Sequence, residues 1–498
     1  MAIEKGIGSG GDAPITAQEQ AEIDVIELGT QPGQVTMDDG SVILGDISEE
    51  MLMQEAPVEI PFDANLVDFM DDADVSKMAS DIVGDIEDDF STRQDWEDTY
   101  KKGVDLLGMQ YEDRTQPFEG ASGVVHPLLS ESVTQFQAQA YRELLPAGGP
   151  VRTQVIGNET SEVLQQADRV KNYMNYQITY EMEEYDPELD QMLFYLPLTG
   201  STFKKVYFDP LLQRAVSKFV HAEDLVVPYE ATDLASANRI THVIKMSKNE
   251  VRKLQLSGFY ADVDLPGDGY SDEDYSEIQE SIDEAQGVHP SGDSSDITLY
   301  EVHTNLDLPG FEDMGIDGEP TGLEIPYIVT ICEKNNAVLS IRRNYEQTDP
   351  LMRQKPYFVH YKFLPGLGFY GFGLTHMIGG LSQAATSLLR QLIDAGTLSN
   401  LPAGFKARGA RIRDEDEPLA PGEFRDIDVA GMDIRQSLMT LPFKEPSQTL
   451  YSLLGTLVDS GRRFASMADM KVAEMGGETP VGTTMAIMER GTKVMSAI

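Results

Sequence analysis

Residues 447–498 read SQTLYSLLGTLVDSGRRFASMADMK, then VAEMGGE, then TPVGTTMAIMERGTKVMSAI. The apolar spacing predicts a helix, an acidic and glycine-rich break, and a second helix. Upstream, residues 374–399 read LTHMIGGLSQAATSLLRQLIDAGTLS and predict another long helix. A segment of short strands and turns, ending near Pro446, separates the two long runs. Helices flanking an insert and a loop, with no catalytic constellation among them, suit the subunit of a ring-shaped channel.

Composition indicates a folded protein with a sizeable core. The chain has 498 residues, of which 41% are hydrophobic, enough for two to four domains or one large domain with insertions. A single cysteine, Cys332, excludes a disulfide framework and a cysteine-rich zinc site. No apolar run approaches the roughly 18 residues of a membrane span, and the N-terminus lacks the pattern of a secretory signal. We therefore expect a soluble protein made in the cytoplasm.

The charge is strongly negative and uneven. The net charge is −46; residues 1–92 hold 23 acidic residues against Lys5 and Lys77, and residues 264–296 hold 11 with no Lys or Arg. Both regions are typical of a solvated tail or loop. Tight binding to DNA phosphates needs clustered Lys and Arg, so the chain as a whole is not a DNA-gripping protein.

The N-terminal half predicts an arm followed by helices. Residues 1–60 are polar and poorly periodic, typical of a mobile arm. One helical stripe is predicted over about 74–102, and further helices over about 128–145 and 161–182. The first stripe comprises Val75, Met78, Ile82, Ile86, Phe90, Trp96 and Tyr100; the last helix carries Val163, Val170, Tyr173, Met174 and Ile178.

The middle of the chain predicts strands. The runs are 203–210, 213–227, 239–246, 297–306, 325–334, 338–344 and 357–363. Short turns such as 334–337 leave no room for crossover helices, so we expect one mostly antiparallel sheet. A short helix over 247–258 is predicted to begin at Ser247 with Glu250 three residues later, a capping box.

The insert at 402–446 carries two opposite charge blocks side by side. They suit head-to-tail pairing between neighbouring subunits; the alternative is a solvated turn. The basic block is Lys406, Arg408, Arg411 and Arg413, and the acidic block is Asp414, Glu415, Asp416 and Glu417.

Two glycine patterns resemble nucleotide sites without their context. Gly366, Gly368 and Gly371 match G-x-G-x-x-G, but the flanking sheet is predicted to be antiparallel, so we interpret them as a sharp turn from sheet into helix. Residues 477–484 resemble a P-loop but have Thr483 where the lysine must stand, and they follow a helix. A flexible loop is the favoured interpretation.

Catalytic, cofactor and metal sites are not predicted. No H-x-x-x-H or H-E-x-x-H spacing occurs, so His221 with Glu223, or His376 alone, are interpreted as structural groups although they could be ligands in principle. The carboxylates are too numerous for one acid–base pair to be singled out. We expect a protein that is not an enzyme and binds no cofactor.

About residues 75–498 resemble the portal proteins of tailed double-stranded-DNA bacteriophages, especially the short-tailed type. The resemblance is carried by GASGVVHPLLSESVTQFQAQAYRELLPAGGP (120–150), GSTFKKVYFDPLLQRAVSKFVHAEDLVVPYEATDL (200–234) and FYGFGLTHMIGGLSQAATSLLRQLIDAGTLSNLPAGF (369–405). It implies an α+β portal fold with an α/β wing, a two-helix stem, a small β-containing clip and a long wing helix, the crown being absent or truncated. The implied parts are the arm (1–60), the wing (61–373), stem helix 1 (374–401), the clip (402–446), stem helix 2 (447–467), the tunnel loop (468–482) and the start of the wing helix (483–498).

The resemblance also implies a function. Twelve subunits would form a ring at one capsid vertex of the virion, assembled in the host cytoplasm, through which terminase packages DNA and the genome is later ejected. Implied partners are other copies of the chain, the major capsid protein, the terminase large subunit, head-completion or adaptor and tail proteins, and DNA passing without sequence specificity; no membrane is involved. The clip charges would contact terminase, adaptor or a neighbouring subunit. The tunnel candidates that would face DNA are Arg462, Arg463, Lys471, Glu474, Gly476 and Gly477.

Two alternatives to a portal stay open. One is a head-to-tail adaptor or another virion ring protein. The length of the chain and the order of long helix, insert and long helix argue against it. The other, less favoured, is a nucleotide-dependent enzyme built on the glycines at 366–371 or 477–484.

Overall fold

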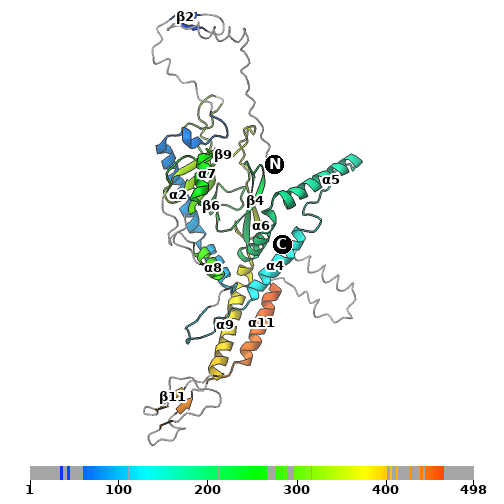
Figure 1. Ribbon diagram of the computed structural model, residues 1–498, viewed down its shortest axis with the longest axis vertical. Coiled ribbons are helices and arrows are strands. Elements are labelled where there is room, and N and C mark those ends of the chain that lie inside the picture. Colours follow the sequence, from blue (N-terminus) through cyan, green and yellow to red (C-terminus); the bar gives the residue numbers. More distant parts are fainter. Residues whose placement is uncertain are drawn as a thin grey trace, which may run out of the picture. The chain divides into compact units, whose positions relative to one another are not determined.

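A computed structural model describes residues 60–109, 112–210, 212–265, 276–288, 296–315, 317–400 and 443–464, together with the backbone of six short strands. The chain divides into two units, Met1–Ala64 and Asn65–Ile498. The first contains an antiparallel pair, β1 (Gln34–Thr36) and β2 (Val42–Leu44). The sequence predicted no strand in this arm. The second unit is a mixed α+β structure (Figure 1).

The predicted strands form two antiparallel sheets instead of the one sheet expected. The first has the order β10-β3-β4, with β3 at Ser201–Asp209, β4 at Arg214–Val220 and β10 at Phe358–Lys362. β10 pairs with β3, about 155 residues earlier, and not with the strand that precedes it. Alternation of apolar residues identifies a strand but not its partner, so the split into two sheets could not be seen in the pattern.

The second sheet has the order β5-β6-β7-β8-β9. Neighbouring strands pair antiparallel in chain order, and the predicted short turn at 334–337 joins β8 to β9. The strands are β5 (Leu225–Val226), β6 (Arg239–Ser247), β7 (Asp296–Leu306), β8 (Ile325–Cys332) and β9 (Val338–Arg343).

The predicted stripe over 74–102 is two helices. After the 3-10 turn η1 (Leu66–Phe69), α2 covers Asp72–Thr92 and α3 covers Gln94–Asp105. The break lies at Arg93, whose side chain is buried and donates hydrogen bonds to the carbonyls of Ala222 (3.3 Å) and Leu225 (3.0 Å). Because these acceptors belong to the connection between β4 and β5, a tertiary contact overrides a helical pattern that is locally continuous.

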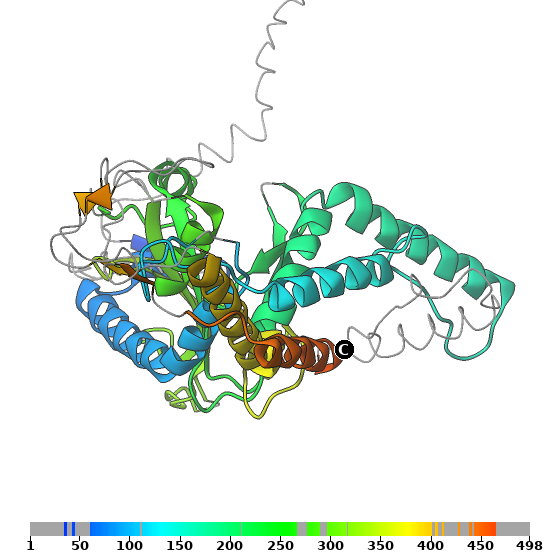
Figure 2. The same cartoon turned by 90° about the horizontal axis from the view of Figure 1, so that it is seen from below.

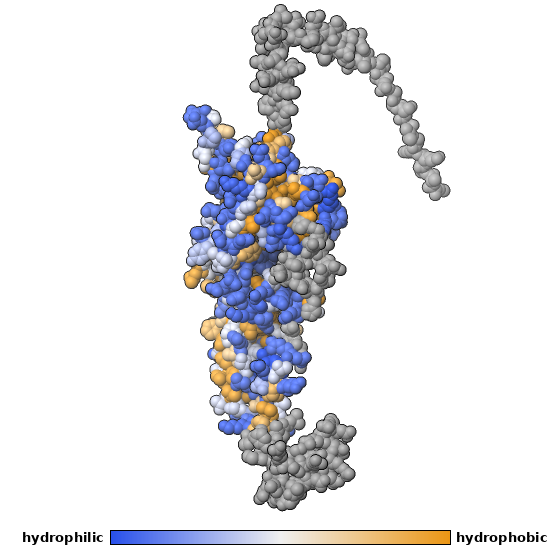
Figure 3. Space-filling view, turned by 90° about the vertical axis from the view of Figure 1, so that its left-hand side faces the viewer, coloured by the Kyte–Doolittle hydropathy of each residue, from blue (hydrophilic) through white to orange (hydrophobic). Residues whose placement is uncertain are grey.

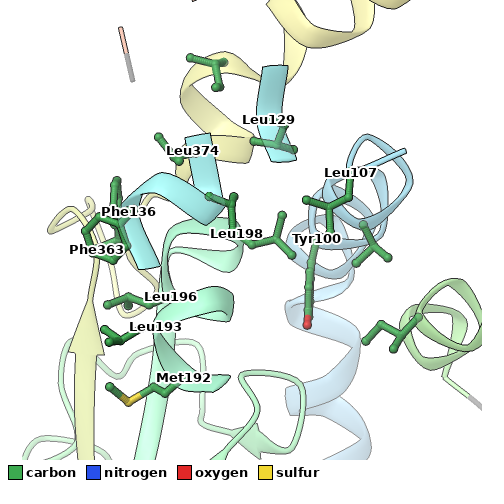
Figure 4. Packing of buried hydrophobic residues seen from close by; sticks show 14 of the residues in the cluster. Tyr100, Leu107, Leu129, Phe136, Met192, Leu193, Leu196, Leu198, Phe363 and Leu374 are labelled. Carbon is green, nitrogen blue, oxygen red and sulfur yellow. The ribbon is translucent and has the colours of Figure 1, made fainter. Parts of the chain in front are cut away.

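The main core joins helices to the first sheet. α4 (Leu128–Leu144) and α6 (Tyr185–Thr199) pack together with α3 and the end of β10. Figure 4 shows Phe136 of α4 beside Phe363, just after β10, and their rings meet edge-on at 5.1 Å. The sequence interpretation assigned no helix to α6, although its last turns are buried.

Two further helices lie between β6 and β7 in the chain, α7 against β6 and α8 against α3. α7 (Lys248–Leu256) begins with the predicted capping box, in which the Ser247 hydroxyl accepts from the Glu250 N–H and the Glu250 carboxylate accepts from the Ser247 N–H. α8 (Glu277–Gln286) lies in the acidic region that was predicted to be a solvated loop. Ile278 and Ile282, four positions apart, are buried on one face of α8. The prediction of a solvated loop was therefore wrong for this segment.

The remaining helices extend outward from this body (Figures 1 and 2). α5 (Ser161–Tyr176) continues into the π-helical turn η2 (Gln177–Glu181), close to the predicted helix 161–182. α9 (Leu374–Asn400) and α11 (Gln448–Phe464) are the two long helices predicted at 374–401 and 447–467. Between them lie two antiparallel strand pairs, β11 (Gly404–Lys406) with β14 (Leu438–Thr440) and β12 (Arg411–Ile412) with β13 (Ile427–Asp428).

Candidate functional site

The candidate site is the pair of helices α9 and α11, since the sequence placed a channel stem there. The chain leaves the body along α9 and returns along α11, so the two helices pack antiparallel (Figure 1). At their distal end Gly396 faces the ring of Pro446, where an added Cβ would lie 3.7 Å from it. At the other end, Gly461 of α11 lies against Leu128 of α4 and leaves no space for a larger residue. Close packing at Gly461 thus fixes the body end of the pair, whereas at the distal end Gly396 meets Pro446 at an ordinary van der Waals distance.

Glycines fix the start of α9. Gly200 ends α6 with φ of 86°, and its backbone crosses the segment that carries Gly371 and Gly373. A Cβ added at Gly373 would lie 2.7 Å from the Gly200 nitrogen, and one at Gly371 would lie 2.5 Å from the Gly200 oxygen. The Gly371 N–H donates to the Ser201 hydroxyl at 2.8 Å. The G-x-G-x-x-G match at 366–371 therefore lies in the turn from β10 into α9, as the sequence interpretation predicted. Its last glycine, Gly371, is needed because the backbone passes close to Gly200 there.

Residues 112–126, which we call the strap, lie against α9. Three polar side chains of α9, spaced four residues apart, bind its backbone. Thr386 Oγ1 accepts from the His126 N–H at 3.0 Å, Arg390 Nε donates to the Val124 carbonyl at 2.8 Å, and Asp394 Oδ1 accepts from the Ser122 N–H at 2.7 Å.

The spacing of these bonds follows from the two backbones. Four residues of an α-helix rise about 6 Å, and two residues of an extended chain span about 6.6 Å. Each turn of α9 thus meets every second residue of the strap. Gly123 allows two parts of the strap to approach each other closely, because a Cβ there would overlap the Glu112 carbonyl oxygen.

Arg462, at the end of α11, is one of the two predicted tunnel cations that the structure describes. Its guanidinium lies 3.1 Å from the Glu131 carboxylate in the first turn of α4. Burial and the nearby Arg462 charge lower the pKa of His126, which precedes that helix. Arg463 is exposed, and it forms no ion pair with any residue that the structure describes. The two adjacent arginines therefore have different surroundings.

The other predicted site residues lie outside the described residues in whole or in part. Lys471, Glu474, Gly476 and Gly477 fall beyond residue 464, as does the P-loop-like run 477–484. In the insert, Lys406 and Arg411 are placed only by backbone, in β11 and β12. Arg408, Arg413, Asp414, Glu415, Asp416 and Glu417 are outside the described residues.

The histidines proposed as possible ligands have structural surroundings. His221 packs edge-on against Tyr195 at 4.6 Å, and burial lowers its pKa to about 4. His376 accepts from the Gly373 N–H at 3.2 Å and so caps the start of α9. Burial raises the pKa of Glu223 to about 7, near the buried Arg93. Within the described part of the chain, no group of three or more His, Cys, Asp or Glu side chains is placed to hold a metal ion.

Sequence reasoning missed one buried charge network between the two sheets. Lys205 of β3 lies 2.6 Å from Glu301 of β7, and the Glu301 carboxylate also contacts His303 Nε2 at 2.9 Å. Burial opposes ionisation of Glu301, yet Lys205 and His303 hold its pKa well below the usual range. Lys205 and Glu301 are 96 positions apart, so no local pattern signals the pair. We interpret the network as a structural junction.

Among the described helices, none combines the length and the apolar character needed to cross a bilayer. Comparison with protein-family models yields no match, and no curated protein is significantly similar to the chain.

Proposed function

We propose that this chain is a subunit of a portal ring, a non-enzymatic channel through which double-stranded DNA enters and leaves a phage capsid. The observation that carries the proposal is the antiparallel pair α9–α11, with a strand-containing insert at its far end and an α+β body at its root. In this assignment the pair is the stem, the insert 402–446 is the clip, and 61–373 is the wing. Residues 468–482 would be the tunnel loop, and 483–498 would begin the wing helix.

The way the stem is anchored supports the assignment. The start of α9 is held by the Gly200 crossing, its middle by the strap, and the end of α11 by Leu128 and Glu131 of α4. A stem that carries load between motor and capsid needs such fixed attachments, because a loosely hinged helix pair would transmit force poorly. These contacts attach both helices of the pair to the body.

The surface of the stem supports lateral contact with other copies. Ile393 of α9 is 39% exposed, and Tyr451 and Leu453 of α11 are 64% and 46% exposed. Figure 3 shows apolar patches over this region, on a surface that is otherwise largely hydrophilic. Apolar side chains on both helices would be buried between neighbouring stems in a closed ring.

The charge supports a channel that does not hold its cargo. With −46 per chain, twelve chains would carry roughly −550, a net charge that disfavours tight binding of phosphates, although most of it lies in residues 1–92 and 264–296 and not in the stem helices. Arg463, which is exposed at the body end of the stem, would be a cation that touches the DNA backbone locally. Terminase and adaptor proteins would dock at the clip, and the major capsid protein would contact the wing.

Electron microscopy of the purified protein tests the proposal. We expect negatively stained rings with a central hole, and a molar mass by light scattering of about twelve chains of 55.0 kDa. Monomers or open filaments at all protein concentrations would contradict a portal. Rings that fail to support DNA packaging with any terminase, but bind a head–tail interface, would favour the adaptor alternative.

A further inference from the structure

The helix α5 leaves its apolar stripe uncovered within the described part of the chain. None of its 16 residues is buried. Val163, Val170 and Met174 are 37%, 44% and 42% exposed, and with Ala167 and Ile178 they follow one another at intervals of three or four residues. This spacing places all five on one face of the helix.

A different face of α5 is held in place. The Asn175 side chain donates to the Val151 carbonyl at 3.2 Å and accepts from the Val151 N–H at 2.9 Å. The Thr160 hydroxyl accepts from the Val163 N–H and caps the first turn. Figures 1 and 2 show α5 extending away from the two sheets. The helix is therefore positioned from one side while its apolar stripe faces outward.

An uncovered stripe of this kind needs a partner. Most helical stability in proteins comes from packing an amphipathic face, because helices of this length are marginal alone in water. Tyr173, Tyr176 and Tyr180, on a separate face of the helix, are 59%, 50% and 74% exposed. The candidate partner should present a complementary stripe with little charge.

The sequence after α11 contains such a stripe. In residues 483–498, Ile487, Met488, Val494, Met495 and Ile498 fall on one helical face, and the charged residues Glu489, Arg490 and Lys493 fall on the opposite face. The segment carries one net positive charge in a chain of −46, so acidic repulsion does not oppose its docking. Methionine side chains adapt to irregular apolar surfaces.

The position of α11 brings this segment within reach. Arg462 contacts Glu131 in the first turn of α4, and Tyr141, ten residues along α4, bonds to Asp186 just after the end of η2. Ten helical residues rise about 15 Å. The 18 residues between Phe464 and Thr483 would span about 25 Å as a flexible chain. A flexible tether of this length would give the segment an effective concentration near the millimolar range at α5.

We propose that residues 483–498 of the same chain dock as a helix on the stripe formed by Val163, Ala167, Val170, Met174 and Ile178. The contact would close the outer face of α5 and return the chain from the stem to the body. It does not depend on the portal assignment, because it requires only the exposed stripe, the apolar pattern and the tether length.

Cysteine cross-linking of the full chain tests the contact. Cys332, the one native cysteine, is buried, so it should react little with the cross-linking reagent. Val170→Cys combined with Met488→Cys should be joined by a short bis-maleimide. Val170→Cys combined with Arg490→Cys, on the charged face, is the matched control and should be joined at least fivefold less. Equal linking of both pairs, or linking of neither, would overturn the proposal.

Mixing isotopically light and heavy chains shows which copy supplies the segment. Linked peptides from one isotope, with a yield independent of dilution, support docking within the chain. Mixed-isotope peptides would overturn it in favour of a second copy. Hydrogen exchange gives a separate readout: Met488→Glu should speed amide exchange across 163–178 about tenfold, and Arg490→Glu should leave it unchanged. Unchanged exchange in Met488→Glu would also overturn the proposal.

Discussion

The Asp394 carboxylate, in the distal part of α9, accepts a hydrogen bond of 2.7 Å from the backbone N–H of Ser122, 272 residues earlier. Asp394 is only 9% exposed, so this N–H is the partner of a buried acidic side chain near the distal end of α9. The bond belongs to a series with Thr386 and Arg390 that fastens the strap along α9. These bonds tie α9 to the strap, which is the segment just before α4.

Removing the Asp394 carboxylate should release the strap while the rest of the chain stays folded. An N–H left without a partner in a part-buried site costs about 1–3 kcal/mol, which corresponds to roughly tenfold or greater acceleration of local exchange. We expect Asp394→Ala to speed amide exchange in 120–126, as measured by mass spectrometry. Asp394→Asn keeps an acceptor oxygen and should restore much of the protection. The exposed α9 residue Gln391, changed to Ala, is the control; equal effects there would disprove the assigned role.

An added methyl group should destabilise the chain at Gly371, where the backbone passes close to Gly200, but not at Gly368. A Cβ at Gly371 would lie 2.5 Å from the Gly200 oxygen, whereas one at Gly368 meets nothing within 4 Å. Forcing an extra carbon into a packed site costs about 1–3 kcal/mol. Gly371→Ala should therefore lower the thermal midpoint and speed proteolysis near 362–374, and Gly368→Ala should not. A normal melting curve for Gly371→Ala would refute the crossing.

Glu223 should make stability fall as pH rises. Burial raises its folded-state pKa to about 7 from 4.5, despite Lys245 and Arg93 nearby, so between those values the folded chain binds a proton that the unfolded chain releases. The carboxyl therefore favours folding below about pH 4.5, and that contribution is lost as pH rises through 7. Glu223→Gln should raise the thermal midpoint at pH 8 and change it little at pH 4.5, with a free-energy effect of about 1–3 kcal/mol.

His221 opposes this trend. Burial lowers its pKa to about 4 from 6.5, so its contribution is present above pH 6.5 and is lost as pH falls toward 4. Without Glu223, acidification should therefore reduce stability more steeply than in the unchanged chain. Glu230→Gln, at an exposed carboxylate a few residues on, serves as the control. A midpoint shift of the same size at pH 4.5 and pH 8 would contradict the pKa assignment.

Substitution of Arg462 should change the stability of the chain, whereas substitution of Arg463 should change DNA packaging. Arg462→Glu places two acidic groups together at Glu131 and should lower the thermal midpoint slightly, by the equivalent of about 0.5–1 kcal/mol for a half-exposed pair. Arg463→Glu should leave the melting curve unchanged and reduce DNA packaging in a reconstituted assay. If Arg463→Glu packaged DNA normally, its role at the channel wall would be withdrawn.

Charge reversal in the insert tests the clip assignment. Arg408→Glu with Arg411→Glu should impair ring assembly or motor docking and leave the monomer's circular dichroism unchanged. A matched reversal of Asp414 and Glu415 to Lys in the same chain should partly restore assembly if the two blocks pair between subunits. Normal rings and normal packaging in the basic-block variant would show that the insert is not the clip.

Local sequence patterns predicted a helix well where one side of it packs against the rest of the protein along its whole length. The capping box at Ser247 and Glu250 and the two long helices could be derived because propensity, periodicity and end signals agree there. α8 was missed because eleven acidic residues in 264–296 outweighed the short spacing of Ile278 and Ile282.

Long-range contacts could not be derived in the same way. Nothing near Arg93 in the sequence shows that carbonyls at Ala222 and Leu225 will receive its guanidinium and end α2. The strap bonds likewise join residues about 260 to 272 positions apart. Polar residues on α9 such as Thr386 and Asp394 resemble ordinary breaks in an apolar stripe until their backbone partners are known.

The order of chemical groups along α9 allows one axial position only. Thr386 and Asp394 present acceptors to N–H groups, and Arg390 between them presents a donor to a carbonyl. A slide of α9 by one turn would bring Arg390 to the amide of His126 and Asp394 to the carbonyl of Val124, which sets donor against donor and acceptor against acceptor. A register shifted by one turn is thus disfavoured by electrostatic mismatch. A stepwise slide of α9 along the strap is therefore unfavourable, and the strap either keeps this register or dissociates from α9.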